Sequence, residues 1–397
     1  MVIKNVKVYT ENQEFVSGEV VIRDGRFAEG EAPDDPEEVL DGEGCYAIPG
    51  LIDLHFHGCK GYDFCDGTRE SIAGIAEYEA SVGVTAIAPA TMTLPVNELE
   101  EILSVAADYK KEAQKAGALG ADLIGVNMEG PFISEEKKGA QDARNIISCN
   151  EEICRRFLKA SDGLVRFVGV APERSEDAEE FICRMKNQVH ISLAHTNADY
   201  DTAMKAFAAG ADHAVHLYNA MPAFTHRNPG VVGAVSDSAH VNAELICDGV
   251  HIHPSVVRAT FKMLGADRIV LISDSMRATG MPDGRYTLGG LDVDVSGNRA
   301  VLASNGALAG SATNLMDCMK TAVQKMGIPL ETAVACATMN PAKCLGVYEE
   351  YGSIAPGKKG NIVLLDEELK VKAVVKDGVR LGLPEASVKE EGIWQEL

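Results

Sequence analysis

The chain has 397 residues, of which 46% are hydrophobic and 24% charged, proportions that are ordinary for a soluble globular protein. Its formal net charge of -22 at pH 7 disfavours nucleic acid and anionic membranes as partners, and an anionic substrate would need a local positive pocket. The ten cysteines include no Cys-x-x-Cys pair, no apolar run is long enough to cross a bilayer, and the first residues lack the apolar centre of a signal peptide. We therefore expect a cytoplasmic protein with free cysteines.

Both ends of the chain predict short strands. The strand-like segments are residues 2–8, 19–22, 362–365 and 372–375. Asp24-Gly25 and Asp377-Gly378 are hairpin signals, and the acidic stretch 29–38 is typical of an exposed loop. Because neither end has enough strands to bury a core alone, we expect residues 1–50 and 351–397 to form one small β-sandwich together.

Between the ends, residues 51–350 alternate between strand-like and helix-like segments, which is the pattern of βαβ units on a parallel sheet. The eight predicted strands are residues 51–57, 84–90, 123–129, 165–171, 189–195, 212–217, 243–248 and 269–274. Helices are predicted at residues 69–81, 96–115, 151–160, 177–187, 199–209, 254–264, 313–326 and 330–338, and an inserted hairpin at 286–302. Eight strands favour an α/β fold with a closed, TIM-like (β/α)8 barrel over a doubly wound sheet.

Six side chains suited to metal binding or acid–base chemistry follow apolar runs at the ends of predicted strands. They are His55, His57, Glu129, His195, His216 and Asp274. Because barrel enzymes build their active sites at the carboxyl ends of the strands, we expect these residues to form one metal-dependent hydrolase site. Imidazole and carboxylate ligands suit zinc and iron alike, so the pattern predicts a divalent metal without naming it.

Each of these residues also has a simpler explanation when taken alone. A lone His-x-His pair is more often a surface or core feature, Glu129 could be a capping or ion-paired residue, and Asp274 could be a helix N-cap. However, His55 and His57 are spaced so that both would point to the same face of a strand. Asp274 could also take the proton of a metal-bound water. The recurrence of such residues at several strand ends favours the functional interpretation.

Longer motifs surround these residues. They are segments 49–58, 128–132, 138–140, 194–198, 216–221, 248–251, 273–274, 308–311 and 340–342. With these motifs the chain resembles the amidohydrolase superfamily over essentially its whole length and, within it, the N-acetylglucosamine-6-phosphate deacetylase family. The resemblance implies an amidohydrolase-type barrel that hydrolyses the acetamide of N-acetylglucosamine 6-phosphate to glucosamine 6-phosphate and acetate.

The resemblance also implies a role for each matching residue. The main catalytic metal would be held by Glu129, His195 and His216. His55 and His57 match members in which a second ion can bind, so one or two ions per subunit are expected. Asp274 would be the general base and acid. The implied substrate-binding residues are Ala140, Gln141, Asn219, Ala220, Arg227, Asp248, His251, Leu308 and Ala309.

The phosphate of the substrate would meet Arg227 and His251, with Arg227 reaching in from the neighbouring subunit of a homodimer. Two positions depart from the family pattern. Gln141 stands where the family often has a histidine near the acetyl carbonyl, and a glutamine cannot be a cationic donor. Asn228 stands where a glutamate is common. N-acetylgalactosamine 6-phosphate therefore remains an alternative substrate.

Two further alternatives remain open. Another amidohydrolase, such as a D-amino-acid deacylase, a cyclic amidase or a deaminase, would use the same fold, although no lysine ends a predicted strand as the bridging ligand of a cyclic amidase would. A catalytically inactive relative that acts as a binding protein would ordinarily have lost metal ligands or the final aspartate, and all six residues are present here.

Overall fold

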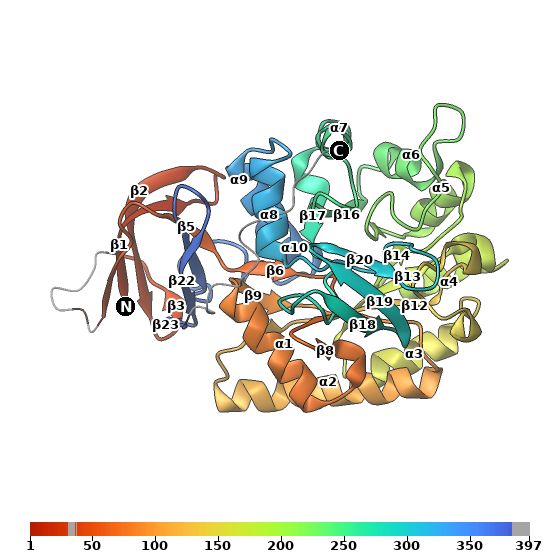
Figure 1. The fold of residues 1–397 in the computed structure, drawn as a ribbon, viewed down its shortest axis with the longest axis horizontal. Coiled ribbons are helices and arrows are strands. Elements are labelled where there is room, and N and C mark those ends of the chain that lie inside the picture. The colour runs from red at the N-terminus through yellow and green to blue at the C-terminus, as the bar shows by residue number, and fades with distance from the viewer. Residues whose placement is uncertain (31–35, 37, 383–397) are drawn as a thin grey trace.

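The computed structural model describes residues 1–30, 36 and 38–382, so most of the predicted loop 29–38 lies outside the described residues. The two chain ends meet in a sheet at one end of the molecule, and the middle of the chain forms a larger parallel-sheet unit surrounded by helices (Figure 1).

The sheet built from the chain ends contains eight strands. They are β1 (Val2–Tyr9), β2 (Phe15–Arg23), β3 (Arg26–Phe27), β4 (Val39–Asp41), β5 (Tyr46–Pro49), β21 (Ile362–Leu365), β22 (Val371–Lys376) and β23 (Val379–Arg380). The ends are joined where β5 pairs antiparallel with β21. Both predicted hairpins form, with positive φ at Asp24, Gly25, Asp377 and Gly378, as two-residue turns of this kind require.

The central sheet is parallel and consists of two sections, one of seven strands and one of three, which together occupy eight strand positions. Its strands are β6 (Leu51–Asp53), β9 (Val84–Ile87), β10 (Ala90–Thr91), β11 (Asp122–Leu123), β12 (Val126–Phe132), β13 (Val165–Val170), β14 (His190–Leu193), β15 (His213–Ala214), β16 (Asn242–Ile246) and β17 (Ile269–Ile272). The predicted strands at 84–90 and 123–129 are each interrupted, giving β9 with β10 and β11 with β12. Beyond the strand ends, Asp274 N donates to His55 O and His57 N donates to Ser275 O, so the last position lies beside the first.

Most observed strands are shorter than predicted, and this changes where the site residues lie. β6 ends at Asp53, so His55 and His57 follow the strand instead of alternating along it. Glu129 lies inside β12 because that strand continues to Phe132. The predicted strand 212–217 is reduced to His213–Ala214, because the chain turns through positive φ at His216.

Helices cover the outside of the central sheet (Figure 1). They are α1 (Arg69–Ser81), α2 (Val96–Ala116), α3 (Glu151–Ala160), α4 (Ala178–Met185), α5 (Tyr200–Ala209), α6 (Gly230–Asp237), α7 (Pro254–Leu264), α8 (Leu315–Gln324), α9 (Leu330–Ala337) and α10 (Met339–Cys344). Four begin with the side-chain caps that favour helix starts: Thr68, Asn150, Asp199 and Asn314. α6 was not predicted, because six of its eight residues are buried and no polar face marks its period.

The prediction of a two-stranded hairpin at 286–302 is wrong. The segment forms a three-stranded antiparallel sheet of β18 (Gly284–Leu288), β19 (Leu291–Ser296) and β20 (Arg299–Leu302). Two glycine-containing turns, at 289–290 and 297–298, divide it into three strands. Buried side chains of this inserted sheet pack with Ala140 and Ala309 in one apolar cluster.

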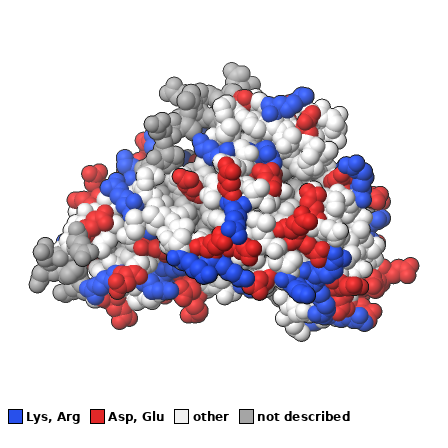
Figure 2. All heavy atoms as spheres, turned by 90° about the horizontal axis from the view of Figure 1, so that it is seen from below, with Lys and Arg blue, Asp and Glu red and all other residues white. Residues whose placement is uncertain are grey.

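The surface carries charges of both signs. On the face seen from below in Figure 1, acidic and basic side chains are intermixed (Figure 2). No helix in the described part of the chain is both long and apolar enough to cross a membrane.

Candidate metal centre

The other five predicted residues gather around Glu129, four histidines directly and Asp274 through His57, and all six are buried. The Nε2 atoms of three histidines surround Glu129 Oε1, at 3.2 Å for His55, 3.0 Å for His195 and 2.8 Å for His216. His57 Nε2 lies 3.3 Å from Glu129 Oε2 and 3.3 Å from Asp274 Oδ1. The structure therefore brings together residues that are more than 200 positions apart in the sequence.

The loops that follow the strands aim three of these side chains inward. His195, His216 and Asp274 follow β14, β15 and β17, and their φ angles are 43°, 27° and 50°. Such left-handed conformations are unfavourable for residues other than glycine and cluster at functional sites. Glu129 is placed differently, from within β12, where the strand register shifts between Met128 and Phe132.

Hydrogen bonds on the far side of the rings set which nitrogen faces the centre. His195 Nδ1 lies 2.8 Å from Lys137 O, and His216 Nδ1 lies 3.2 Å from Asn219 O. A carbonyl oxygen accepts only from an N–H, so each ring carries a proton on Nδ1, and in the neutral ring Nε2 presents a lone pair. The two Nε2 atoms are only 3.2 Å apart, so a cation or proton must lie between these lone pairs and Glu129.

This donor set fits a divalent metal. Two groups of side chains place their ligand atoms within reach of one ion: His55 with Glu129 and His216, and His55 with His57 and Asp274. Among the described residues, His55 Nε2 is buried without a hydrogen-bond partner, as expected of an atom that binds an ion. Ligand bonds of about 2.1 Å in tetrahedral geometry separate ligand atoms by about 3.4 Å, which matches the spacings around Glu129.

In the absence of an ion, the carboxylates and histidines neutralise each other. Burial alone would raise the pKa of Glu129, but the facing His195 and His55 hold it well below its usual value. Burial likewise opposes protonation of His57, yet its hydrogen bond to Asp274 and the Glu129 carboxylate raise its pKa to about 10. Binding of a metal through His57 must therefore displace a proton from that ring.

Gln141 contacts the centre in a way that the sequence did not suggest. Its Nε2 donates to Glu129 Oε2 at 2.7 Å, and its Oε1 accepts from Thr93 N at 2.6 Å. Both ends of the amide are therefore engaged by protein groups, and Gln141 holds the glutamate in place.

Asp248 and His251 form a buried pair after β16. Asp248 Oδ1 accepts from the main-chain N of Val250 and His251, and its Oδ2 lies 2.7 Å from His251 Nδ1. Burial opposes protonation of His251, but its hydrogen bond to Asp248 raises its pKa above the usual value. A histidine of this kind can supply local positive charge.

The other predicted substrate residues lie on different loops. Asn219 and Ala220 follow His216, and Ala220 O accepts from Thr196 N, which ties together the loops after β14 and β15. Leu308 is partly buried beside the inserted sheet. Arg227 lies on the exposed loop between β15 and α6, where its Nη1 lies 2.6 Å from His226 Nε2, and within one subunit it is not brought to the metal centre.

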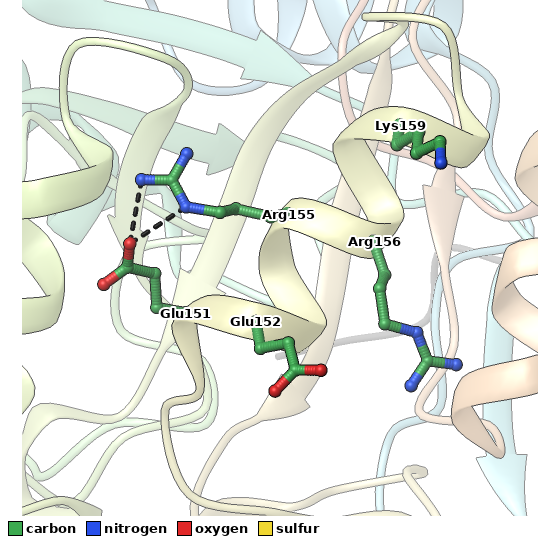
Figure 3. Close-up of a pocket in the computed structure, with 5 residues that line it drawn as sticks. All are labelled: Glu151, Glu152, Arg155, Arg156 and Lys159. Atoms are coloured by element: carbon green, nitrogen blue, oxygen red, sulfur yellow. Dashed lines mark hydrogen bonds and ion pairs between the residues drawn. The ribbon is translucent and has the colours of Figure 1, made fainter.

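A surface hollow elsewhere on the molecule does not belong to this centre. It is lined by charged residues of α3, where Arg155 points toward Glu151 (Figure 3). It shares no residue with the predicted site and lies on the outside of the helix layer.

The sequence interpretation missed Glu244. This residue lies fully buried within β16 and contacts both His55 and the backbone of His216. One signal was available, because a charged residue inside an otherwise apolar buried strand needs a partner.

Comparisons with known proteins identify the family of this chain. The Amidohydrolase family model matches residues 46–381. N-acetylglucosamine-6-phosphate deacetylase of Vibrio furnissii is 36% identical over 325 residues, or 82% of this chain and 80% of that protein. N-acetylgalactosamine-6-phosphate deacetylase of Escherichia coli O157:H7 is 35% identical over 342 residues, or 85% and 88%. The structure of a variant N-acetyl-D-glucosamine-6-phosphate deacetylase from Mycobacterium smegmatis, in complex with N-acetyl-D-glucosamine-6-phosphate, has a TM-score of 0.86 at 31% identity and covers 96% and 98% of the two chains.

Proposed function

Because this chain belongs to the amidohydrolase family, we propose that it hydrolyses the acetamide of N-acetylglucosamine 6-phosphate, releasing glucosamine 6-phosphate and acetate. The observation that carries the proposal is the convergence of four histidine Nε2 atoms and Asp274 on one buried glutamate. The names and coverage of the curated relatives support the substrate class.

The proposed ligands of the main metal are Glu129, His195 and His216, and His55 with His57 would hold a second ion. We propose zinc or iron, one or two ions per subunit. An ion bound there lowers the pKa of its water and polarises the carbonyl oxygen of the substrate.

Asp274 is the proposed general base and acid. Although burial would raise its pKa, the hydrogen bond from His57 lowers it, so the carboxylate is ionised and can accept a proton. It takes one proton from the attacking water as the C–O bond forms, and it returns that proton to the amine nitrogen as the C–N bond breaks.

The phosphate would be bound by His251, which Asp248 holds in place, and by Arg227 of a neighbouring subunit. Phe224 lies on the same loop as Arg227 and is 51% exposed, which supports a homodimer that uses this loop. The sugar-binding site would be lined by Ala140, Asn219, Ala220, Leu308 and Ala309. Gln141 would act indirectly, by holding Glu129 in place.

We also propose the finer architecture. The hydrogen bonds between the ends of β6 and β17 support a closed (β/α)8 barrel over residues 51–350. The shared apolar cluster of β1, β2, β5, β21 and β22 supports a β-sandwich of residues 1–50 and 351–397. All ten cysteines are free, which is consistent with a cytoplasmic protein.

The function is tested by acetate release from N-acetylglucosamine 6-phosphate and N-acetylgalactosamine 6-phosphate, using protein loaded with zinc or iron. We expect release from the glucosamine derivative to be the faster. Faster release from the galactosamine derivative would support the second candidate, which the similarity to the Escherichia coli enzyme favours. Failure with both sugars in metal-loaded protein would overturn the proposed substrate class.

A further inference from the structure

Glu244 is a fully buried carboxylate in the middle of β16, beside the metal centre but outside the set of predicted ligands. Its neighbours in the strand are apolar, and a buried charge of this kind is costly unless every oxygen is engaged. The contacts of its two oxygens show which residues Glu244 orients.

The two oxygens have different partners. Oε2 lies 2.8 Å from His55 Nδ1 and accepts from His216 N at 3.0 Å. Oε1 lies 3.0 Å from Nε2 of the buried His213. The main-chain oxygen of Glu244 also accepts from Leu217 N at 2.9 Å.

The contact with His55 decides which ring nitrogen can bind an ion. A carboxylate at Nδ1 requires the proton there, which leaves the Nε2 lone pair facing Glu129 in the neutral ring. His55 has its ligand atom in both groups that could hold an ion. If the proton moved to Nε2, neither group would be complete.

The contact with His216 holds a strained turn. His216 has a φ of 27°, and its own N–H and that of Leu217 both donate to Glu244. These two bonds fix the backbone that aims the imidazole at Glu129.

We propose that Glu244 is a positioning residue of the metal centre, in which one buried oxygen orients the ring of His55 and the backbone of His216 at the same time. The inference rests on the proposed metal centre. It predicts that the two groups of ligands are set jointly by a residue that touches neither substrate nor metal.

The main test is Glu244→Gln, which preserves the volume and the main-chain bond. Asn127 Nδ2 also donates to Oε1 at 3.5 Å, so the carboxylate makes four contacts. An amide accepts on only one edge and carries no charge, so at least one of the four is lost. We expect the dissociation constant for Zn²⁺, measured by competition with a chelator, to rise about 10–100-fold. The thermal midpoint of the metal-free protein is measured alongside to separate metal affinity from stability.

Two variants serve as controls. Glu79→Gln neutralises another fully buried glutamate, on α1, whose oxygens contact none of the proposed ligands. His213→Phe removes the histidine contact on the other oxygen and leaves those to His55 and His216. Both are expected to keep the wild-type affinity for Zn²⁺, although His213→Phe lowers the thermal midpoint.

The outcomes separate this inference from the proposed function. Weaker Zn²⁺ binding in Glu244→Gln alone supports the positioning role. Equal loss in Glu244→Gln and His213→Phe would show a general structural role and overturn it, as would wild-type affinity in Glu244→Gln. If the wild-type protein binds neither Zn²⁺ nor Fe²⁺, the proposed metal centre itself fails.

A second measurement applies even if Glu244→Gln does not fold. In wild-type protein loaded with Zn²⁺, the ¹⁵N chemical shifts of His55 report which ring nitrogen carries the proton. The inference predicts a protonated Nδ1 and a metal-bound Nε2, and the opposite arrangement would overturn it.

Discussion

One carboxylate oxygen of Glu129 and one of Asp122 each contact three partners, and the difference between their partners separates a reactive region from a structural one. Glu129 Oε1 faces the Nε2 atoms of three histidines in the metal centre. Asp122 Oδ2, where β11 meets the terminal sheet, contacts Lys359 Nζ at 3.0 Å, Lys376 Nζ at 3.1 Å and Tyr351 hydroxyl at 3.0 Å.

The partners of Asp122 carry their own protons, so that network is complete as it stands. Asp377 adds a second carboxylate to the two lysines. The imidazoles around Glu129 can instead bind a metal ion through the Nε2 atoms that face it. The different partners of the two carboxylates therefore give a fixed joint between two sheets in one region and a candidate ion site in the other.

The largest expected effect comes from Asp274→Asn in the metal centre. The amide cannot accept the proton of the attacking water, so we expect kcat to fall about 10²–10⁴-fold. The bound metal, measured by elemental analysis, should stay at the wild-type level because Glu129, His195 and His216 are unchanged. Retained turnover in this variant would remove Asp274 from the proposed mechanism.

Asp122→Asn is the matching change in the structural network. It leaves two lysines facing an amide, and because the side chains of Asp122 and Lys359 are 23% and 25% exposed, we expect a smaller loss than the roughly 3–5 kcal/mol of a fully buried pair. Chemical denaturation should show this loss, with kcat unchanged. The double variant Asp122→Asn with Lys376→Met should recover part of the stability, because it also removes a buried charge. A change in kcat as large as that in stability would mean that the two regions are coupled.

Glu79→Gln tests a buried carboxyl group that is paired with neither histidines, as Glu129 is, nor lysines, as Asp122 is. Burial and the nearby Asp53 raise the pKa of Glu79 well above its usual value, so the folded protein keeps a proton that the unfolded chain releases above about pH 4.5. The stabilisation present below that pH is lost as pH rises, by up to about 1.4 kcal/mol per unit. The variant should therefore gain stability relative to wild type as pH increases from 5 to 8. If the difference in stability between the variant and the wild type does not vary with pH, the pKa of Glu79 is not raised.

The smallest effect is expected at Arg285, which pairs with Asp294 across β18 and β19 on the exposed face of the inserted sheet. Arg285→Ala should cost no more than about 1 kcal/mol, because both side chains are in water. Thermal unfolding at two salt concentrations measures it. A larger loss would show that the inserted sheet depends on this pair.

The sequence was sufficient to predict all eight strand positions, but the places where two of them break were not predicted. β9 and β10 belong to one predicted run, and Pro89 between them, which has no backbone N–H to donate, was an available signal for the interruption. α10 was also missed, because it is only six residues long and contains Pro341. Local patterns locate these elements, whereas contacts with neighbouring elements set their ends.

The six site residues could be predicted because each is a polar residue beside an apolar run, a local signal. Glu244 lies inside its run, and the residue that explains it, His55, is 189 positions away. Gln141 was predicted to lie near the substrate, but its contact with Glu129 depends on how two loops meet. Residues that act through other residues leave little trace in the pattern of a single chain.

The pairing of β5 with β21 has a consequence for synthesis. A ribosome adding about 5–20 residues per second needs roughly 15–60 s to pass from the first of these strands to the second. During that interval Ala47 and Ile48, fully buried in the finished protein, can pair with β1 on one side but lack β21 on the other. The nascent chain must therefore shield this edge before the last part of the sheet arrives, and the rate of translation becomes part of how well the protein folds.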